Sequence, residues 1–192
     1  MNVYDFDKTI YDGDSTFHFL MFCAKRNPKV LFKLPRIAVR GILFLCGAIK
    51  KQAFKEDMFS FLSVIDTDRE LEAFWSRNIS GIKQWYKENQ HEDDLVITAS
   101  PEFLVEYATR MIGIKYIMGS PVDKHTGKYT GNNCHGKEKV VRFNEAYPDA
   151  KIEEFYSDSY SDSPLANISE KAFLVKGNKL LPWDMERSKK HI

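Results

Sequence analysis

The hydrophobic pattern of this 192-residue chain separates a helical stretch from a region of alternating strands and helices. A short apolar run over 2–6 predicts a first strand. Over 15–65 apolar residues recur at helical spacing, with interruptions at Pro28 and Pro35, and a second stripe of helical spacing covers 69–89. The pattern therefore predicts an all-helical stretch inserted after the first strand.

The second half of the chain has a different pattern. Strands are predicted over 95–97, 115–118, 152–156 and 172–175, and helices over 100–111, 136–146 and 164–168. Ser100 and Pro101 fit the N-cap and the first position of the helix that follows the second strand. A hairpin is predicted over 122–131, turning near Thr126.

Strands that alternate with helices indicate an α/β fold with a mostly parallel, Rossmann-like sheet and helices on both of its faces. The inserted helices form a small all-helical cap. We expect the catalytic core to comprise 1–12 and 91–192, and the helical cap domain to comprise 13–90.

Composition supports a globular chain in a reducing compartment. Hydrophobic residues make up 43% and charged residues 29%. The three cysteines, Cys23, Cys46 and Cys134, are widely spaced and form no CxxC pair, which argues against a disulfide framework or a zinc site. The first residues lack the basic and apolar pattern of a secretory signal, so we expect a cytoplasmic protein.

Polar residues with catalytic potential follow several of the predicted strands. They are Asp5 and Asp7, then Thr98, then Lys137 and Lys139, then Asp158 and Asp162. Reactive groups gather at the carboxyl ends of strands in open α/β sheets, so we expect these four segments to converge on one site.

This inventory suits phosphoryl transfer. A carboxylate that attacks phosphorus needs a cation beside it, and hard oxygen ligands such as Asp5 and Asp158 select Mg²⁺, with Asp162 steadying the site. Asp7 emerges from the same strand end as Asp5 and can act as general acid and base. Thr98 and a lysine would hold the phosphoryl oxygens.

The order Asp-x-Asp-x-Thr, Thr, Lys, Asp-x-x-x-Asp over 5–162 resembles the four-motif signature of the haloacid dehalogenase-like phosphatases. Details around Thr98 and Lys139 are similar to the subgroup of phosphoserine phosphatase and a bacterial phosphatidylglycerophosphatase. The resemblance implies an aspartyl-phosphate on Asp5 and a Mg²⁺ ion bound also by the backbone carbonyl of Asp7.

Two assignments stay open at this point. The subgroup spacing favours Lys139 as the phosphate ligand, whereas alignment to phosphoserine phosphatase favours Lys137. Asp14 stands where phosphoserine phosphatases place a glutamate that holds the substrate's amino group, but it is shorter and is also a suitable helix cap.

The net charge of +1 conceals a strong asymmetry. Between Asp14 and Glu56 the chain has nine basic residues and no acidic one, so the remainder carries 19 basic residues against 27 acidic ones, a formal −8. The basic stretch is either a solvated cap surface or a surface for an anionic membrane at the inner face of the cell. Apolar residues expected to enter such a membrane are Leu31, Phe32, Ile42, Leu43, Phe44 and Leu45.

The leading expectation is therefore a Mg²⁺-dependent phosphomonoesterase, with a preference for a phosphorylated lipid such as phosphatidylglycerophosphate because of the basic cap. The first alternative is a soluble-metabolite phosphatase for phosphoserine or a similar compound. A non-enzymatic module that binds anions or nucleic acid is the second alternative. It is disfavoured, and no nucleic-acid partner is expected, since a pure binder has no need of Asp5, Asp7 and Asp158 together.

Overall fold

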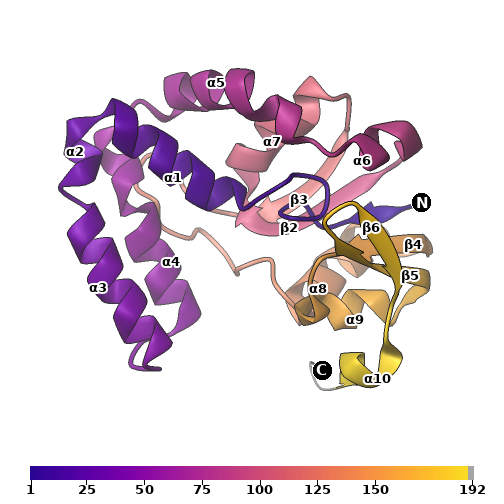
Figure 1. The fold of residues 1–192 in the computed structure, drawn as a ribbon. Coiled ribbons are helices and arrows are strands. Elements are labelled where there is room, and N and C mark those ends of the chain that lie inside the picture. Colours follow the sequence, from indigo (N-terminus) through magenta and orange to yellow (C-terminus); the bar gives the residue numbers. More distant parts are fainter. Residues whose placement is uncertain (190–192) are drawn as a thin grey trace.

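The strands of this computed structural model, which describes residues 1–189, join in one sheet of order β3-β2-β1-β4-β5-β6 (Figure 1). Their bounds are Val3–Tyr4 (β1), Leu95–Pro101 (β2), Tyr116–Ser120 (β3), Ile152–Ser157 (β4), Ser169–Lys176 (β5) and Lys179–Pro182 (β6). Strands β1 to β5 pair in parallel, and β6 pairs antiparallel to β5. The strand that precedes Asp5 therefore lies between β2 and β4.

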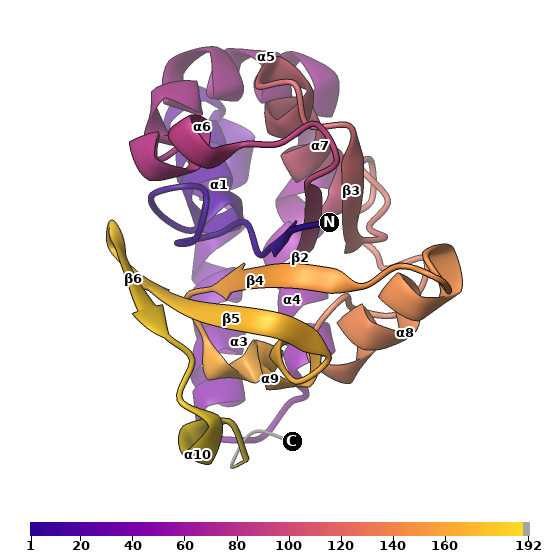
Figure 2. The same cartoon turned by 90° about the vertical axis from the view of Figure 1, so that its right-hand side faces the viewer.

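Alternating side chains of the central strands feed two hydrophobic clusters, one on each face. Tyr4 and Val96 belong to one cluster, and Val3 and Leu95 belong to the other. Helices α5 (Thr67–Asn78), α6 (Gln84–Asn89) and α7 (Glu102–Met111) lie on the first side, while α8 (Lys137–Ala146) and α9 (Ser163–Ala166) cover the second (Figure 2). The α/β fold with helices on both faces of a mostly parallel sheet is confirmed.

The helices between β1 and β2 begin and end at residues that the sequence marks. Their bounds are Ser15–Arg26 (α1), Pro28–Leu31 (α2), Leu34–Leu45 (α3) and Lys51–Phe59 (α4), followed by a short 3₁₀ segment, Ser60–Val64 (η1). Asp14 caps α1 by accepting a hydrogen bond from the backbone N–H of Phe17. The two prolines at 28 and 35 fall in the first turns of α2 and α3, where a missing N–H costs nothing.

The inserted helices differ in whether they pack near the sheet or away from it. Helices α3 and α4 lie side by side away from the sheet (Figure 1), whereas α5 packs against α1 and α7, and α6 contacts β1 through Tyr86. Trp75 meets Phe6 edge to face and donates its indole N–H to the carbonyl of Leu104, and Tyr86 meets Tyr4 edge to face. The division into 1–12, 13–90 and 91–192 stays a prediction.

Several local expectations differ from the structure. Strand β2 continues through Pro101, so Ser100 is not the cap of α7 and its side chain faces the site described below. The hairpin over 122–131 consists of a single antiparallel bridge between Val122 and Tyr129. Strand β6 and the short helix α10 (Met185–Ser188) were not predicted, because neither has a clear hydrophobic period.

In the part of the chain that the structure describes, no helix has the length and hydrophobicity needed to cross a bilayer.

Candidate active site

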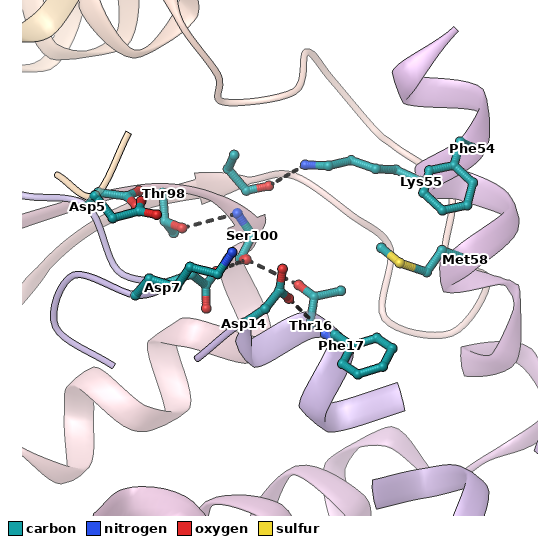
Figure 3. Close-up of a pocket in the computed structure, with 13 residues that line it drawn as sticks. Asp5, Asp7, Asp14, Thr16, Phe17, Phe54, Lys55, Met58, Thr98 and Ser100 are labelled. Atoms are coloured by element: carbon teal, nitrogen blue, oxygen red, sulfur yellow. Dashed lines mark hydrogen bonds between the residues drawn. The ribbon is translucent and has the colours of Figure 1, made fainter. Parts of the chain in front are cut away.

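A cavity of about 510 Å³ opens where β1, β2 and β4 end (Figure 3). Its walls bring together segments that are more than 150 residues apart in the chain. The residues that line it are Asp5, Asp7, Lys8, Asp14, Thr16, Phe17, Phe54, Lys55, Met58, Thr98, Ala99, Ser100 and Asp158. Five of the predicted site residues are thus gathered in one cavity, four of them at or just after the carboxyl ends of parallel strands and Asp14 at the start of α1.

Asp5 lies at the floor of the cavity and is 8% exposed. Its backbone N–H donates to the carbonyl of Tyr156, so the pairing of β1 with β4 fixes the position of Asp5. The Lys139 ammonium donates to Asp5 Oδ1 at 2.8 Å and to Asp162 Oδ2 at 2.9 Å. Ser157 Oγ also donates to Asp162 Oδ2 at 2.8 Å. The lysine is 1% exposed and therefore forms a buried ion triad with two carboxylates.

The charges of this triad act on one another strongly. Burial raises the pKa of Asp5 to about 7, against the lowering effect of the Lys139 charge, and the Asp162 charge raises it further. Burial alone would lower the pKa of Lys139, but the charges of Asp162 and Asp5 outweigh burial, so that pKa lies above its usual value. Lys139 is therefore a permanent cation beside the Asp5 carboxyl.

The structure distinguishes the two candidate lysines. Lys139 of α8 is buried and donates to Asp5, whereas Lys137, two residues earlier, is exposed to solvent. Lys139 is consequently the lysine that lies beside Asp5.

Asp7 is held by two hydrogen-bond donors. The backbone N–H of Ser15, at the start of α1, donates to Oδ1 at 2.6 Å, and the Ser100 hydroxyl donates to Oδ2. Thr16 Oγ1 lies 3.1 Å from Ser100 Oγ and extends this chain of polar groups. Burial and the Asp14 charge raise the pKa of Asp7 to about 6, while the hydrogen bonds from Ser100 and Ser15 lower it.

Sequence reasoning missed the role of Ser100 as a partner of Asp7. It interpreted the Ser-Pro pair as a helix start, and only the extension of β2 reveals the contact.

Thr98 and Asp158 complete the cavity floor from the neighbouring strands. Thr98 is 1% exposed, and its Oγ1 accepts from the backbone N–H of Ser100 at 3.1 Å, which leaves its own hydroxyl hydrogen to donate. The backbone N–H of Asp158 donates to Thr9 Oγ1 at 2.9 Å, so the fifth residue of the first motif positions the fourth motif. Burial raises the pKa of Asp158.

The wall opposite Asp5 comes from the inserted helices (Figure 3). Phe17 of α1 and Phe54 and Met58 of α4 present apolar surface, and Lys55 of α4 reaches across to β2. The Lys55 ammonium donates to the carbonyl of Ala99 at 2.9 Å and to Asn133 Oδ1 at 3.0 Å. No spacing in the sequence distinguishes these residues, because their position depends on how α4 packs.

Asp14 lines the cavity at the same time as it caps α1. Both interpretations of this residue are therefore compatible with its position.

The donor set suits Mg²⁺ better than a softer metal. Within residues 1–189 no group of three or more His, Cys, Asp or Glu side chains is arranged to hold a metal by itself. Asp5 and Asp158 nevertheless stand at the ends of adjacent parallel strands, and burial penalises the charge of both. Mg²⁺ usually takes one or two protein carboxylates and fills its remaining positions with water and substrate phosphate, so this sparse oxygen site fits it.

Comparison with known proteins agrees with this geometry. A family model described as haloacid dehalogenase-like hydrolase matches residues 3–167. Protein CicA of Caulobacter vibrioides is 30% identical over 82 residues, a segment that covers 40% of this chain and only 37% of CicA.

Two solved structures share the fold. A protein of unknown function from Bordetella pertussis Tohama I aligns with a TM-score of 0.74 and 18% identity over 90% of this chain and 87% of its own. A structure described as a phospho-aspartyl intermediate analogue of phosphoserine phosphatase aligns with a TM-score of 0.54 and 13% identity over 99% of this chain and 97% of its own. At these identities the likeness is one of fold.

Proposed function

Because this chain belongs to the haloacid dehalogenase-like hydrolase family, we propose that it is a Mg²⁺-dependent phosphatase that hydrolyses phosphomonoesters through an aspartyl-phosphate on Asp5. The observation that carries the proposal is the pair of carboxyl groups at the end of β1. Asp5 is paired with a buried cation, and Asp7 is held by neutral donors two residues later. This difference supports Asp5 as the nucleophile and Asp7 as the proton carrier.

The reaction would proceed in two steps, phosphoryl transfer to Asp5 and hydrolysis of the aspartyl-phosphate. A carboxylate oxygen of Asp5 attacks phosphorus, the bond from phosphorus to the leaving oxygen breaks, and the Asp7 carboxyl gives its proton to that oxygen. The Asp7 carboxylate then takes a proton from water, whose oxygen attacks the aspartyl-phosphate and releases phosphate and Asp5. A pKa of about 6 lets Asp7 exchange a proton in both directions near neutral pH.

Two further residues would neutralise and orient the phosphoryl group. They are Thr98, whose hydroxyl lines the cavity, and Lys139, whose ammonium lies 2.8 Å from Asp5 Oδ1; both would hold the phosphoryl oxygens where charge develops. Asp5, Asp158 and the backbone carbonyl of Asp7 would hold Mg²⁺, with Asp162 fixing Lys139 from behind. The ion supplies positive charge that lets an anionic carboxylate approach an anionic phosphate.

For the leaving group we favour a phosphorylated lipid over a soluble metabolite such as phosphoserine. The cavity wall that would receive it combines the apolar surface of Phe17, Phe54 and Met58 with the Lys55 ammonium. Such a wall suits an amphiphile, such as the head group and first chain atoms of phosphatidylglycerophosphate. Asp14 lines the cavity but is shorter than the glutamate that phosphoserine phosphatases place there, which weakens its case as a ligand for the amino group of phosphoserine.

The test is phosphate release from phosphatidylglycerophosphate in micelles, phosphoserine and p-nitrophenyl phosphate, with Mg²⁺ and with EDTA. We expect turnover that requires Mg²⁺ and that falls at least about 10³-fold in Asp5→Asn, because the nucleophile is lost. The matched control is Asp12→Asn, an exposed carboxylate in the same loop, which we expect to change the rate less than about twofold. Full activity of Asp5→Asn would exclude the aspartyl-phosphate, and a preference for phosphoserine would exclude the lipid substrate.

A further inference from the structure

The outer side of α3 carries an exposed apolar stripe. It consists of Pro35, Val39, Ile42 and Leu45, which are spaced three or four residues apart and so share one side of the helix, and of Phe32 in the turn that joins α2 to α3. Phe32 is 84% exposed, Ile42 61% and Leu45 83%. Contiguous exposed apolar surface of this kind usually marks a site of interaction.

The opposite side of α3 is already occupied. Ile37 is buried, and Phe44 stacks on Phe54 of α4 with ring centroids 5.3 Å apart. Phe44, which the sequence had placed among membrane-entering residues, therefore packs inward. Figure 1 shows α3 at the periphery of the molecule, beyond α4, with no other element over its outer side. The apolar stripe is thus unpartnered within residues 1–189.

The charged residues of α2 and α3, next to the stripe, are all basic. Lys29, just before the stripe, is exposed, and Arg36 and Arg40 lie on the flank of α3 that faces α4. Both arginines contact Asp57, but the Arg36 side chain stays 74% exposed. Since no acidic residue occurs between Asp14 and Glu56, this surface complements an anionic partner.

We propose that the apolar stripe of α3 docks on the surface of an anionic lipid bilayer, with its apolar side chains at the acyl boundary and the neighbouring basic residues among the head groups. Helices with Lys and Arg beside Phe, Leu and Ile lie in such interfaces in this way. A second copy of this chain is a poorer occupant, because it would bring an equally basic surface against this one.

Docking through α3 would also fix where the cavity opens. Helix α4, which packs on the inner side of α3, supplies Phe54, Lys55 and Met58 to the cavity wall. The cavity is therefore held one helix away from the lipid surface. This inference rests on the exposed side of α3 and not on the proposed reaction.

The test is co-sedimentation of the full chain with phosphatidylcholine vesicles that contain or lack phosphatidylglycerol, at low and at physiological salt. Ile42→Asp places a charge in the middle of the stripe at a position that is already exposed, and circular dichroism and a thermal melt report whether it folds. The matched control is Val141→Asp, on an exposed position of α8 on the other side of the sheet (47% exposed).

We expect binding that requires phosphatidylglycerol and that falls about tenfold or more in Ile42→Asp, since the burial of one isoleucine side chain is worth a factor of that order. Val141→Asp should bind as the unmodified chain does. Absence of binding to anionic vesicles at low salt, or equal binding by Ile42→Asp, would overturn the proposal. Dimerisation that Ile42→Asp abolishes, without vesicle binding, would assign the stripe to a second copy instead. Because no turnover is measured, a failure here is separate from a failure of the proposed chemistry.

Discussion

Replacement of Lys139 by methionine tests the buried triad most directly. Methionine has nearly the same length as lysine and fills the same space, so the change removes the charge and leaves the packing largely intact. It leaves the carboxyl groups of Asp5 and Asp162 buried without their shared cation.

The size of the effect follows from the burial of the triad. Loss of one partner of a buried ion pair typically costs about 3–5 kcal/mol in the free energy of unfolding, because the remaining charge is uncompensated. Without Lys139 the pKa of Asp5 should rise above its value of about 7, since the Lys139 charge lowers it. The cost should therefore be largest near pH 8 and smaller at pH 5, where the carboxyl groups can protonate.

The assay is urea unfolding in EDTA at pH 5 and pH 8, together with phosphate release in Mg²⁺. Lys137→Met, an exposed position on the same helix, is the control and should cost less than about 0.5 kcal/mol. Asp162→Asn should recover part of the loss when it is combined with Lys139→Met, because it removes one unpaired carboxylate. A loss below about 1 kcal/mol for Lys139→Met at pH 8, or one equal to that of Lys137→Met, would refute this reasoning.

Three further predictions concern the carboxyl groups. Ser100→Ala removes a donor that stabilises the Asp7 carboxylate, so the pKa of Asp7 should rise from about 6 and the pH profile of phosphate release should move upward by about one unit; an unchanged profile would contradict the contact. In EDTA, the raised pKa values of Asp5 and Asp7, about 7 and about 6, make the folded chain bind more protons than the unfolded chain, so the free energy of unfolding should fall as pH rises from about 4 to about 7. Mg²⁺ binds the ionised carboxylates, so its stabilising effect in thermal melts should be larger at pH 8 than at pH 5, and an equal effect at both would count against the proposed metal site.

The acidic residues of the site could be predicted because their positions depend on strand order alone. Asp5, Asp7 and Asp158 each follow an apolar run, and parallel strands present their carboxyl ends at one edge of the sheet. The choice between Lys137 and Lys139 could not be made in the same way. Side chains two residues apart on an α-helix point in directions about 200° apart around its axis. The choice therefore depends on which side of α8 faces the sheet.

The residues of α4 that line the cavity could not be predicted from the sequence, because their position depends on how the helices pack. Phe54, Lys55 and Met58 lie in a long helical stretch whose pattern shows which residues are apolar but not which helix covers the site. The Ser100 contact was missed because local chemistry favoured a helix cap, whereas pairing with β3 extends β2 through Pro101.

The position of β1 has a consequence for how this molecule folds. The strand has only two residues, and its partners lie about 92 residues later in β2 and about 152 residues later in β4. Contacts between such distant segments form slowly, because closing the long loop between them lowers the chain entropy before the contacts stabilise the fold. During synthesis, which proceeds from the N-terminus, Asp5, the proposed nucleophile, emerges among the first residues, but its contacts with Lys139 and Tyr156 form only with the last third of the chain. A nascent or truncated chain that ends before β4 should therefore have no assembled catalytic centre, however well its helices have formed.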